Sequence, residues 1–328
     1  MISFFGQLRQ ILEQNFNFSK KNLNFSDKLF RLVMQSFERD LQYQKNLPGW
    51  NQVVEIVQDV PPLPTTIEKA LRLIQDGEHV SLRQLTAILE KDSGIASKIL
   101  KVANSALFNR TKEVSNLLTA TTVIGLKTLK GILISTSLKD IFLPETDFLK
   151  FSWRKSAICC VVLRSLSGQI KGIDPEDAAT LGILHNLGEL VLGSHKEYKK
   201  ICSKSFEKAK LEKEVVNFIL EDSLGFKPSL VTALLSKKWN FPDNLCWHIL
   251  HKDSPIDLLG WSGQSFLMHL LFQAVTLMCE LCMIGINYDS ISVRLILKAW
   301  KGADLPIDLC DLEKVINTAL NETNEADF

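Results

Sequence analysis

Histidines are the side chains whose chemistry is most informative here, because a hydrolytic metal site in a helical protein needs histidine and carboxylate ligands from several helices. The sequence has six histidines. His185 comes shortly before Gly188, where a helix end could point it into a cleft, but its neighbour Asn186 is neutral and cannot offset metal charge as a carboxylate would. His248 and His251 are spaced i, i+3 and could face one partner. At each position we favour a satisfied, partly buried histidine over a metal ligand.

Signatures of the common enzyme classes are missing from the sequence. It contains no glycine-rich phosphate loop, no nucleophile elbow and no duplicated Cys-x-x-Cys pair at zinc-site spacing. Cys279 and Cys282 are spaced i, i+3 inside an apolar run, and we interpret them as small buried hydrophobic side chains. The adjacent Cys159 and Cys160 do not suit a disulfide framework, and the first residues lack the features of a secretory signal. We therefore expect a cytoplasmic protein.

Basic residues gather between positions 91 and 130 with few acids among them. The whole chain has 38 basic and 37 acidic residues, so only a local patch could attract a polyanion. Aromatic residues that would stack on bases are almost absent, with Phe108 alone nearby, and nucleic-acid binding is therefore not favoured. The candidate surface for binding another protein consists of Lys91, Lys98, Lys101 and Lys112.

The elements that must position these side chains are helices, because nearly every segment between proline and glycine breaks has a helical period. With 46% hydrophobic residues, the chain is predicted to be an all-α protein. The prolines of residues 60–64 forbid helix and mark a boundary, whereas Asp174-Pro175 is a strong helix start. In a first block, helices are expected over residues 65–74 and 82–91, and two more are expected to begin at residue 93 and after residue 115. A second block is expected to begin with a helix at residue 153 and to continue with helices over 175–184, 204–224, 229–239, 242–251, 290–300 and 312–320.

The longest apolar stretch, Phe266 to Ile286, carries the polar residues His269, Gln273 and Glu280. Charged or strongly polar side chains cost about 2 to 3.5 kcal/mol each at the centre of a bilayer. We therefore interpret the stretch as a buried helix rather than a membrane span. Two amphipathic stretches between residues 3 and 44 form an N-terminal extension that we expect to pack on the body of the protein.

Several short segments between Val53 and Ile286 occur in an order that resembles one known family, the HDOD domains. In the first half they are Val60-Pro61-Pro62-Leu63-Pro64, Leu89-Glu90-Lys91-Asp92, Ala103-Asn104-Ser105-Ala106 and Ile124-Gly125-Leu126. In the second half they are Trp153-Arg154-Lys155-Ser156, the segment from Leu181 to Leu190, Trp239-Asn240-Phe241-Pro242 and Ile249-Leu250-His251-Lys252. The resemblance implies an N-terminal helical lobe packed on a helical lobe related to the HD metal-dependent phosphohydrolases.

The resemblance also shows where metal ligands of HD-type relatives would fall, and most of these positions are changed. A histidine of many relatives is Lys155, the His-Asp pair is His185-Asn186, another histidine falls near Pro228, and paired histidines are reduced to His251-Lys252. A late carboxylate falls near Cys279 or Glu280. A cationic Lys155 would oppose a metal ion by like charge, and it could pair with an anion instead, although a side chain extending to solvent is the simpler expectation.

The domain organisation expected from the resemblance places a helical extension at residues 1–50 and an HDOD domain at 51–290. Within that domain, residues 51–145 form the N-terminal lobe and 146–290 the HD-like lobe, followed by C-terminal helices and an acidic tail over 291–328.

The function that we expect is that of a non-catalytic regulatory module, without metal or cofactor, that binds a protein partner in bacterial signalling. Two alternatives stay open. One is an HD-type phosphohydrolase using His185, His251 and further ligands such as Asp174, Asp177 or Glu189. The other is a sensor that binds a nucleotide or another anion without turnover.

Overall fold

The described part of the chain in this computed structural model is built from helices and contains no strand. Residues 42, 44–75, 81–105, 108, 114–253, 264–285, 307 and 309–322 are described. The predicted all-α class is therefore confirmed. The amphipathic stretches expected between residues 3 and 44 lie outside the described residues except for residues 42 and 44. The helix expected over 290–300 and most of the acidic tail also lie outside them.

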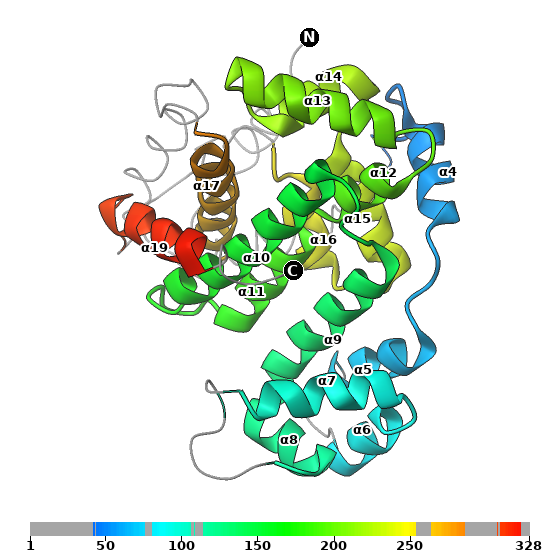
Figure 1. The fold of residues 1–328 in the computed structure, drawn as a ribbon, viewed down its shortest axis with the longest axis vertical. Helices are drawn as coiled ribbons and strands as arrows, with labels where there is room; N and C mark the ends of the chain where they lie inside the picture. Colours follow the sequence, from blue (N-terminus) through cyan, green and yellow to red (C-terminus); the bar gives the residue numbers. More distant parts are fainter. Residues whose placement is uncertain are drawn as a thin grey trace, which may run out of the picture.

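The first lobe is a group of short helices, which Figure 1 shows in its lower part. Ser81 and Asp92 each begin a helix, because their side-chain oxygens accept hydrogen bonds from the backbone nitrogens of Gln84 and Ile95 at 3.4 and 3.0 Å. The last helix runs from this lobe to the second one (Figure 1). The elements are α5 (Thr65–Gln75), α6 (Leu82–Leu89), α7 (Ser93–Ala103), α8 (Leu117–Ile124) and α9 (Leu126–Ile141).

The second lobe contains the long helices of the protein. Its elements are α10 (Asp147–Ser167), α11 (Pro175–Leu184), α12 (Leu187–Ser194), α13 (Lys199–Glu212), α14 (Val216–Leu224), α15 (Pro228–Lys238), α16 (Asp243–Leu250), α17 (Gln264–Ile284) and α19 (Leu309–Glu322). The predicted start of α11 is confirmed, since the Asp174 carboxylate accepts from the backbone nitrogen of Glu176 at 2.9 Å and Pro175 is the first helical residue.

Two predicted helix boundaries in this lobe are wrong. The second helical block begins at Asp147 rather than Trp153, because the Thr146 hydroxyl caps the helix by accepting from the backbone nitrogen of Leu149 at 3.2 Å. The segment 204–224 is two helices, since the backbone of Lys213 turns into the left-handed region at φ 57° and ends α13.

Helix α4 (Trp50–Asp59) precedes the proline segment and packs against α15 of the second lobe. The Lys238 ammonium donates to the carbonyl oxygens of Val57 and Val60 at 2.9 and 2.7 Å, and the indole of Trp239 donates to that of Pro61 at 3.3 Å. The positive charge satisfies carbonyls that the end of a helix leaves free. The chain therefore crosses from the second lobe to the first at the prolines.

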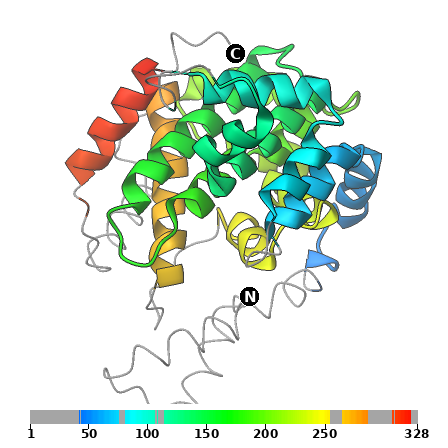
Figure 2. The same cartoon turned by 90° about the horizontal axis from the view of Figure 1, so that it is seen from below.

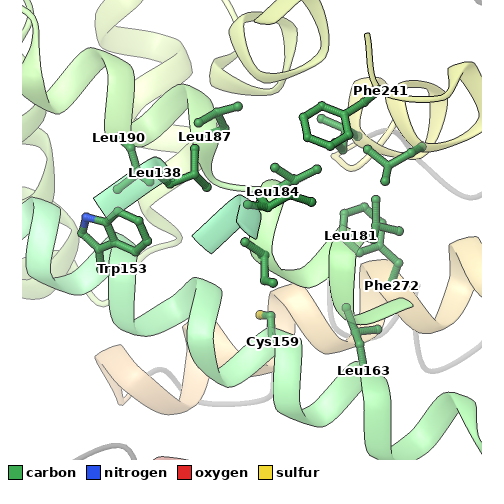
Figure 3. Packing of buried hydrophobic residues seen from close by; sticks show 14 of the residues in the cluster. Leu138, Trp153, Cys159, Leu163, Leu181, Leu184, Leu187, Leu190, Phe241 and Phe272 are labelled. Atoms are coloured by element: carbon green, nitrogen blue, oxygen red, sulfur yellow. The ribbon is translucent and has the colours of Figure 1, made fainter. Parts of the chain in front are cut away.

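Buried apolar residues of both lobes form one contiguous cluster. Figure 3 shows its centre, where Leu138 of α9 lies near Trp153, Leu187 and Leu190 of the second lobe. Helices α10 and α11 approach closely because residue 182 is glycine: a Cβ there would lie 2.7 Å from the backbone of Cys160. The lobes thus share one core, and α9 joins them.

Helix α17 is the apolar stretch noted in the sequence. Among the described residues, α17 is the one unbroken helix that is long and apolar enough to cross a membrane. Helices α8 and α9 would form a second candidate only if the bent pair were treated as one segment. Within Phe266–Ile284, 78% of the apolar segment is buried inside the protein. It packs against α10, α11 and α19, and Figure 2 shows α17 and α19 side by side at one edge. The buried-helix interpretation is therefore supported.

Candidate functional site

The centre of the second lobe is a buried ionic cluster around Lys155 of α10. The side chain is 1% exposed, and its ammonium lies 2.9 Å from Oε1 of Glu189 on α12 and 2.7 Å from Oε2 of Glu280 on α17. The expectation that Lys155 extends to solvent is thus wrong. A buried charge is tolerated only when it is paired, and here the pairing partners come from two other helices.

The remaining oxygens of both glutamates also have donors. Oε2 of Glu189 accepts from the Ser152 hydroxyl at 2.8 Å, and Oε1 of Glu280 accepts from the backbone nitrogen of Val216 at 2.6 Å. Burial by itself would lower the pKa of Lys155, but the two carboxylates outweigh it and hold this pKa above its ordinary value. The cluster is therefore a charged and well-satisfied unit that joins α10, α12, α17 and the start of α14.

A second buried lysine lies beside this cluster. With the amide nitrogen of Asn217 facing Glu189, that nitrogen donates to Oε1 at 3.0 Å while the amide oxygen accepts from Lys252 Nζ at 2.5 Å. The Lys252 ammonium also lies 3.3 Å from a carboxylate oxygen of Asp253. Lys155 and Lys252, two of the positions where the resemblance leads us to expect histidine, thus both bring positive charge into the interior.

His185 ends α11 and is buried, with its Nδ1 2.7 Å from the carbonyl oxygen of Gly182 and its ring edge-on to Phe272. Burial first, and then the positive charges of Lys252 and Lys155, lower the pKa of His185 well below its usual value. The imidazole is therefore neutral, and its Nδ1–H donates to the carbonyl. The Nε2 atom of His185 and the Oδ1 atom of Asn186 have no hydrogen-bond partner within the described ranges.

The other predicted histidines form a separate aromatic group. His248 and His269 stack with ring centroids 5.2 Å apart and Nδ1 atoms 3.1 Å apart, and His251 lies against Trp247 at 4.8 Å. Burial, followed by the charge of His251, lowers the pKa of His248 to about 3, and burial puts the pKa of His269 well below its ordinary range. His248 and His269 are therefore neutral packing groups at physiological pH.

Pro228 and the aspartates named as further ligands have structural roles. Pro228 is the first residue of α15, and its carbonyl oxygen faces the turn at Gly188. Asp174 caps α11 and pairs with Lys127, and Asp177 lies 3.6 Å from Lys130. These ion pairs connect the start of α9 to the second lobe.

A pocket of about 280 Å³ lies near the N-terminal ends of α9, α11 and α16. Its lining includes Lys130, Asp174, Asp177, Leu245, His248 and Met268. The lining contains none of Lys155, Glu189 and Glu280, so the ionic cluster is not part of this pocket.

The candidate interaction surface lies on the first lobe. Lys91, Lys98 and Lys101 are exposed at the end of α6 and along α7, whereas Lys112 lies outside the described residues. Lys98 forms an ion pair of 3.1 Å with Asp140 of α9, so part of its charge is already compensated. Lys101, one turn further along α7, is exposed on the same helix.

These features define an all-helical protein whose second lobe has lysine ammonium groups buried at its centre. The chain belongs to the HDOD domain family, which matches residues 60–255. The resemblance seen in the sequence is therefore confirmed over most of the range in which its motifs lie.

Solved structures of similar fold come from several bacteria. An "HDOD domain protein with unknown function" from Geobacter sulfurreducens has a TM-score of 0.64 and 17% identity, covering 89% of this chain and 98% of its own. A "Putative phosphohydrolase" from Shewanella amazonensis has a TM-score of 0.60 and 21% identity, covering 82% and 97%. A "Putative signal transduction protein" from Marinobacter aquaeolei has a TM-score of 0.55 and 16% identity, covering 84% and 67%. At these identities the likeness shows the fold alone.

One curated relative, an uncharacterized protein of Treponema pallidum, is 24% identical over 236 residues. The match covers 68% of this chain and 45% of that protein, so the chain spans about half the length of the curated relative.

A divalent metal, which HD phosphohydrolases use, does not fit the residues present. Both carboxylates at the centre, Glu189 and Glu280, are engaged by the Lys155 ammonium, and the positive charges of Lys155 and Lys252 act on the neutral His185. No three side chains of histidine, cysteine, aspartate or glutamate converge on a metal position in the described part of the chain. The Lys155 ammonium occupies the point on which both carboxylates converge, so a dication at that point would meet a positive charge already in place.

Proposed function

We propose that this protein is a non-catalytic HDOD module that acts in bacterial signalling by binding another protein. The observation that carries the proposal is the Lys155 ammonium, which occupies Glu189 and Glu280 at the point where HD-type enzymes need free ligands. The same pairing leaves Lys155 unavailable to an anion, which argues against the nucleotide sensor. The free cysteines and the buried α17 agree with a cytoplasmic location.

The first prediction concerns the metal content of the full-length protein. Untagged protein prepared without chelators should contain far less than one equivalent of Mn, Fe, Zn or Ni by mass spectrometry, because its carboxylate donors are occupied. His185→Ala should leave that content unchanged. Stoichiometric metal that His185→Ala removes would overturn the non-catalytic proposal, and phosphoesters would then be the substrates to screen.

The second prediction concerns the exposed lysines of α7. Reversing charge with Lys98→Glu and Lys101→Glu together should weaken binding to a partner isolated with the unaltered protein by roughly tenfold, mainly through slower association. The unfolding midpoint should stay within about 2 °C of the original, since surface substitutions change stability little.

The matched control for this prediction is Lys208→Glu. Lys208 is also an exposed lysine near a carboxylate, but it lies on α13 of the other lobe, 3.9 Å from Glu212. Its reversal should leave the affinity unchanged. Equal weakening by both variants, or none by the α7 pair, would place the interaction elsewhere on the surface.

A further inference from the structure

Helix α13 lies in a dense run of lysines on the outside of the second lobe. Residues 196–214 contain seven lysines and four glutamates, an excess of three positive charges in a chain whose formal net charge is +1. The side chains of α13 that are buried, among them Cys202, Phe206 and Ala209, occupy one side of the helix. Figure 1 shows α13 and α14 at one end of the long axis, with the first lobe at the other end.

Three lysines follow one another along the outer side of α13. Lys200, Lys204 and Lys208 are spaced by four residues, so their side chains lie along one face of the helix, and all three are exposed. Within the described residues Lys200 and Lys204 form no ion pair, and Lys208 lies 3.9 Å from the carboxylate four residues further on. To the side, Glu207 is already paired with Lys210 at 3.0 Å. The face therefore presents positive charge that the rest of the described chain leaves largely uncompensated.

An exposed leucine continues the same face. Leu211 comes three helical turns after Lys200, and it is 84% exposed, the largest fraction among the exposed large hydrophobic side chains of the described residues. Phe218, beyond the turn at Lys213 that ends α13, is also 39% exposed. A helix lying on a membrane surface places apolar side chains at the boundary between headgroups and acyl chains, with lysines beside them in the headgroup layer.

We propose that the outer face of α13, formed by Lys200, Lys204, Lys208 and Leu211, binds the anionic lipid headgroups of a bilayer surface. Nucleic acid fits this face less well, because Leu211 cannot stack on bases as an aromatic ring does. An acidic protein also fits less well, because the anchors of protein interfaces are mostly aromatic or arginine side chains, and this face has neither. The inference goes beyond the proposed function, since it gives the module a second surface far from the lysines of α7.

The test measures sedimentation of the full chain with vesicles of phosphatidylcholine, either alone or with about 30% phosphatidylserine, at about 0.1 M salt. We expect binding to the anionic vesicles only, and loss of most of it at about 0.5 M salt, because ions screen exposed charges. Lys200→Gln with Lys204→Gln should weaken binding by about 25-fold, since each lysine near an anionic surface contributes about fivefold. Leu211→Ala should weaken it by about tenfold.

Matched controls come from the first lobe and from the end of α9. Lys91→Gln with Lys101→Gln removes two exposed lysines at the opposite end of the molecule, and Leu143→Ala truncates a leucine that is 57% exposed. Both controls should bind anionic vesicles as the unaltered protein does. All of these variants should keep their unfolding temperature within about 2 °C of the original, because substitutions at exposed positions change stability little.

Equal binding to vesicles with and without phosphatidylserine, or binding to neither, would overturn the proposal. It is also overturned if the first-lobe pair weakens binding as much as the α13 pair, because net charge would then be responsible. Binding of polyglutamate in place of vesicles, abolished in the α13 pair, would assign the face to an acidic protein instead. Failure of the proposed function would appear separately, as metal bound to the unaltered protein or as partner binding, measured without lipid, that ignores the lysines of α7.

Discussion

Replacing Lys155 with methionine should lower the free energy of unfolding by about 3 to 5 kcal/mol, which is the usual cost of leaving a buried charge without its partner. Methionine matches the length of the lysine stem, so the loss comes from charge rather than from a cavity. Two carboxylates lose their cation at once, because the ammonium contacts both Glu189 and Glu280. Urea unfolding followed by far-ultraviolet circular dichroism measures the change.

The control separates charge from packing. The triple variant Lys155→Met, Glu189→Gln, Glu280→Gln should recover most of the lost stability, because buried ionic groups replaced by neutral ones of similar volume often leave stability unchanged or improved. Arg164→Met should cost at most about 1 kcal/mol, since its pair with Glu176 is partly exposed to solvent. A Lys155→Met protein within about 1 kcal/mol of the original would show that the cluster contributes little to stability.

Most helices could be predicted from the sequence because their starts are encoded locally. Ser81, Asp92 and Asp174 are polar residues in front of apolar periodic segments, and the structure places each of them at an N-cap. Such a signal needs only the cap and the next three residues. It is therefore independent of how the helices later pack.

The boundary between α13 and α14 could not be predicted, because its cause lies in distant contacts. Lys213 adopts the left-handed backbone without being glycine, and its ammonium donates to the carbonyl oxygen of Ile284, 71 residues away, at 3.1 Å. This contact satisfies a carbonyl at the end of α17. The local sequence at the boundary between α13 and α14, Glu212-Lys213-Glu214, contains only charged residues that suit a continuous helix.

The ionic cluster is not among the features that the sequence predicts, because its members lie on three helices. Lys155 is 34 residues from Glu189 and 125 residues from Glu280, and no local pattern pairs them. A signal was nevertheless present: Glu189 is the one acid in the apolar segment 187–193, and Glu280 is the one acid in the run 266–286. Acids in helices that must be buried need a cation, and Lys155 stands in a third such helix.

The turn that brings Glu189 to Lys155 depends on Gly188, and Gly188→Ala should lower the free energy of unfolding by about 3 kcal/mol, at the upper end of the usual cost of overpacking. A Cβ at this position would lie 2.1 Å from the carbonyl oxygen of Pro228 and 2.8 Å from the Thr232 hydroxyl. Backbone cannot rotate away as a side chain can. The backbone nitrogen of Gly188 also donates to Thr232 at 2.7 Å, so a shift of the turn breaks this bond.

Gly131→Ala is the matched control, because Gly131 is a glycine inside α9 whose added Cβ would meet nothing closer than Ile183 at 3.7 Å. It should raise stability by about 0.5 to 1 kcal/mol through the better helix propensity of alanine. Thermal and urea unfolding of both variants give the comparison. Similar stabilities for Gly188→Ala and Gly131→Ala would mean that α12 and α15 can separate without loss, and that the approach of Glu189 to Lys155 does not depend on this turn.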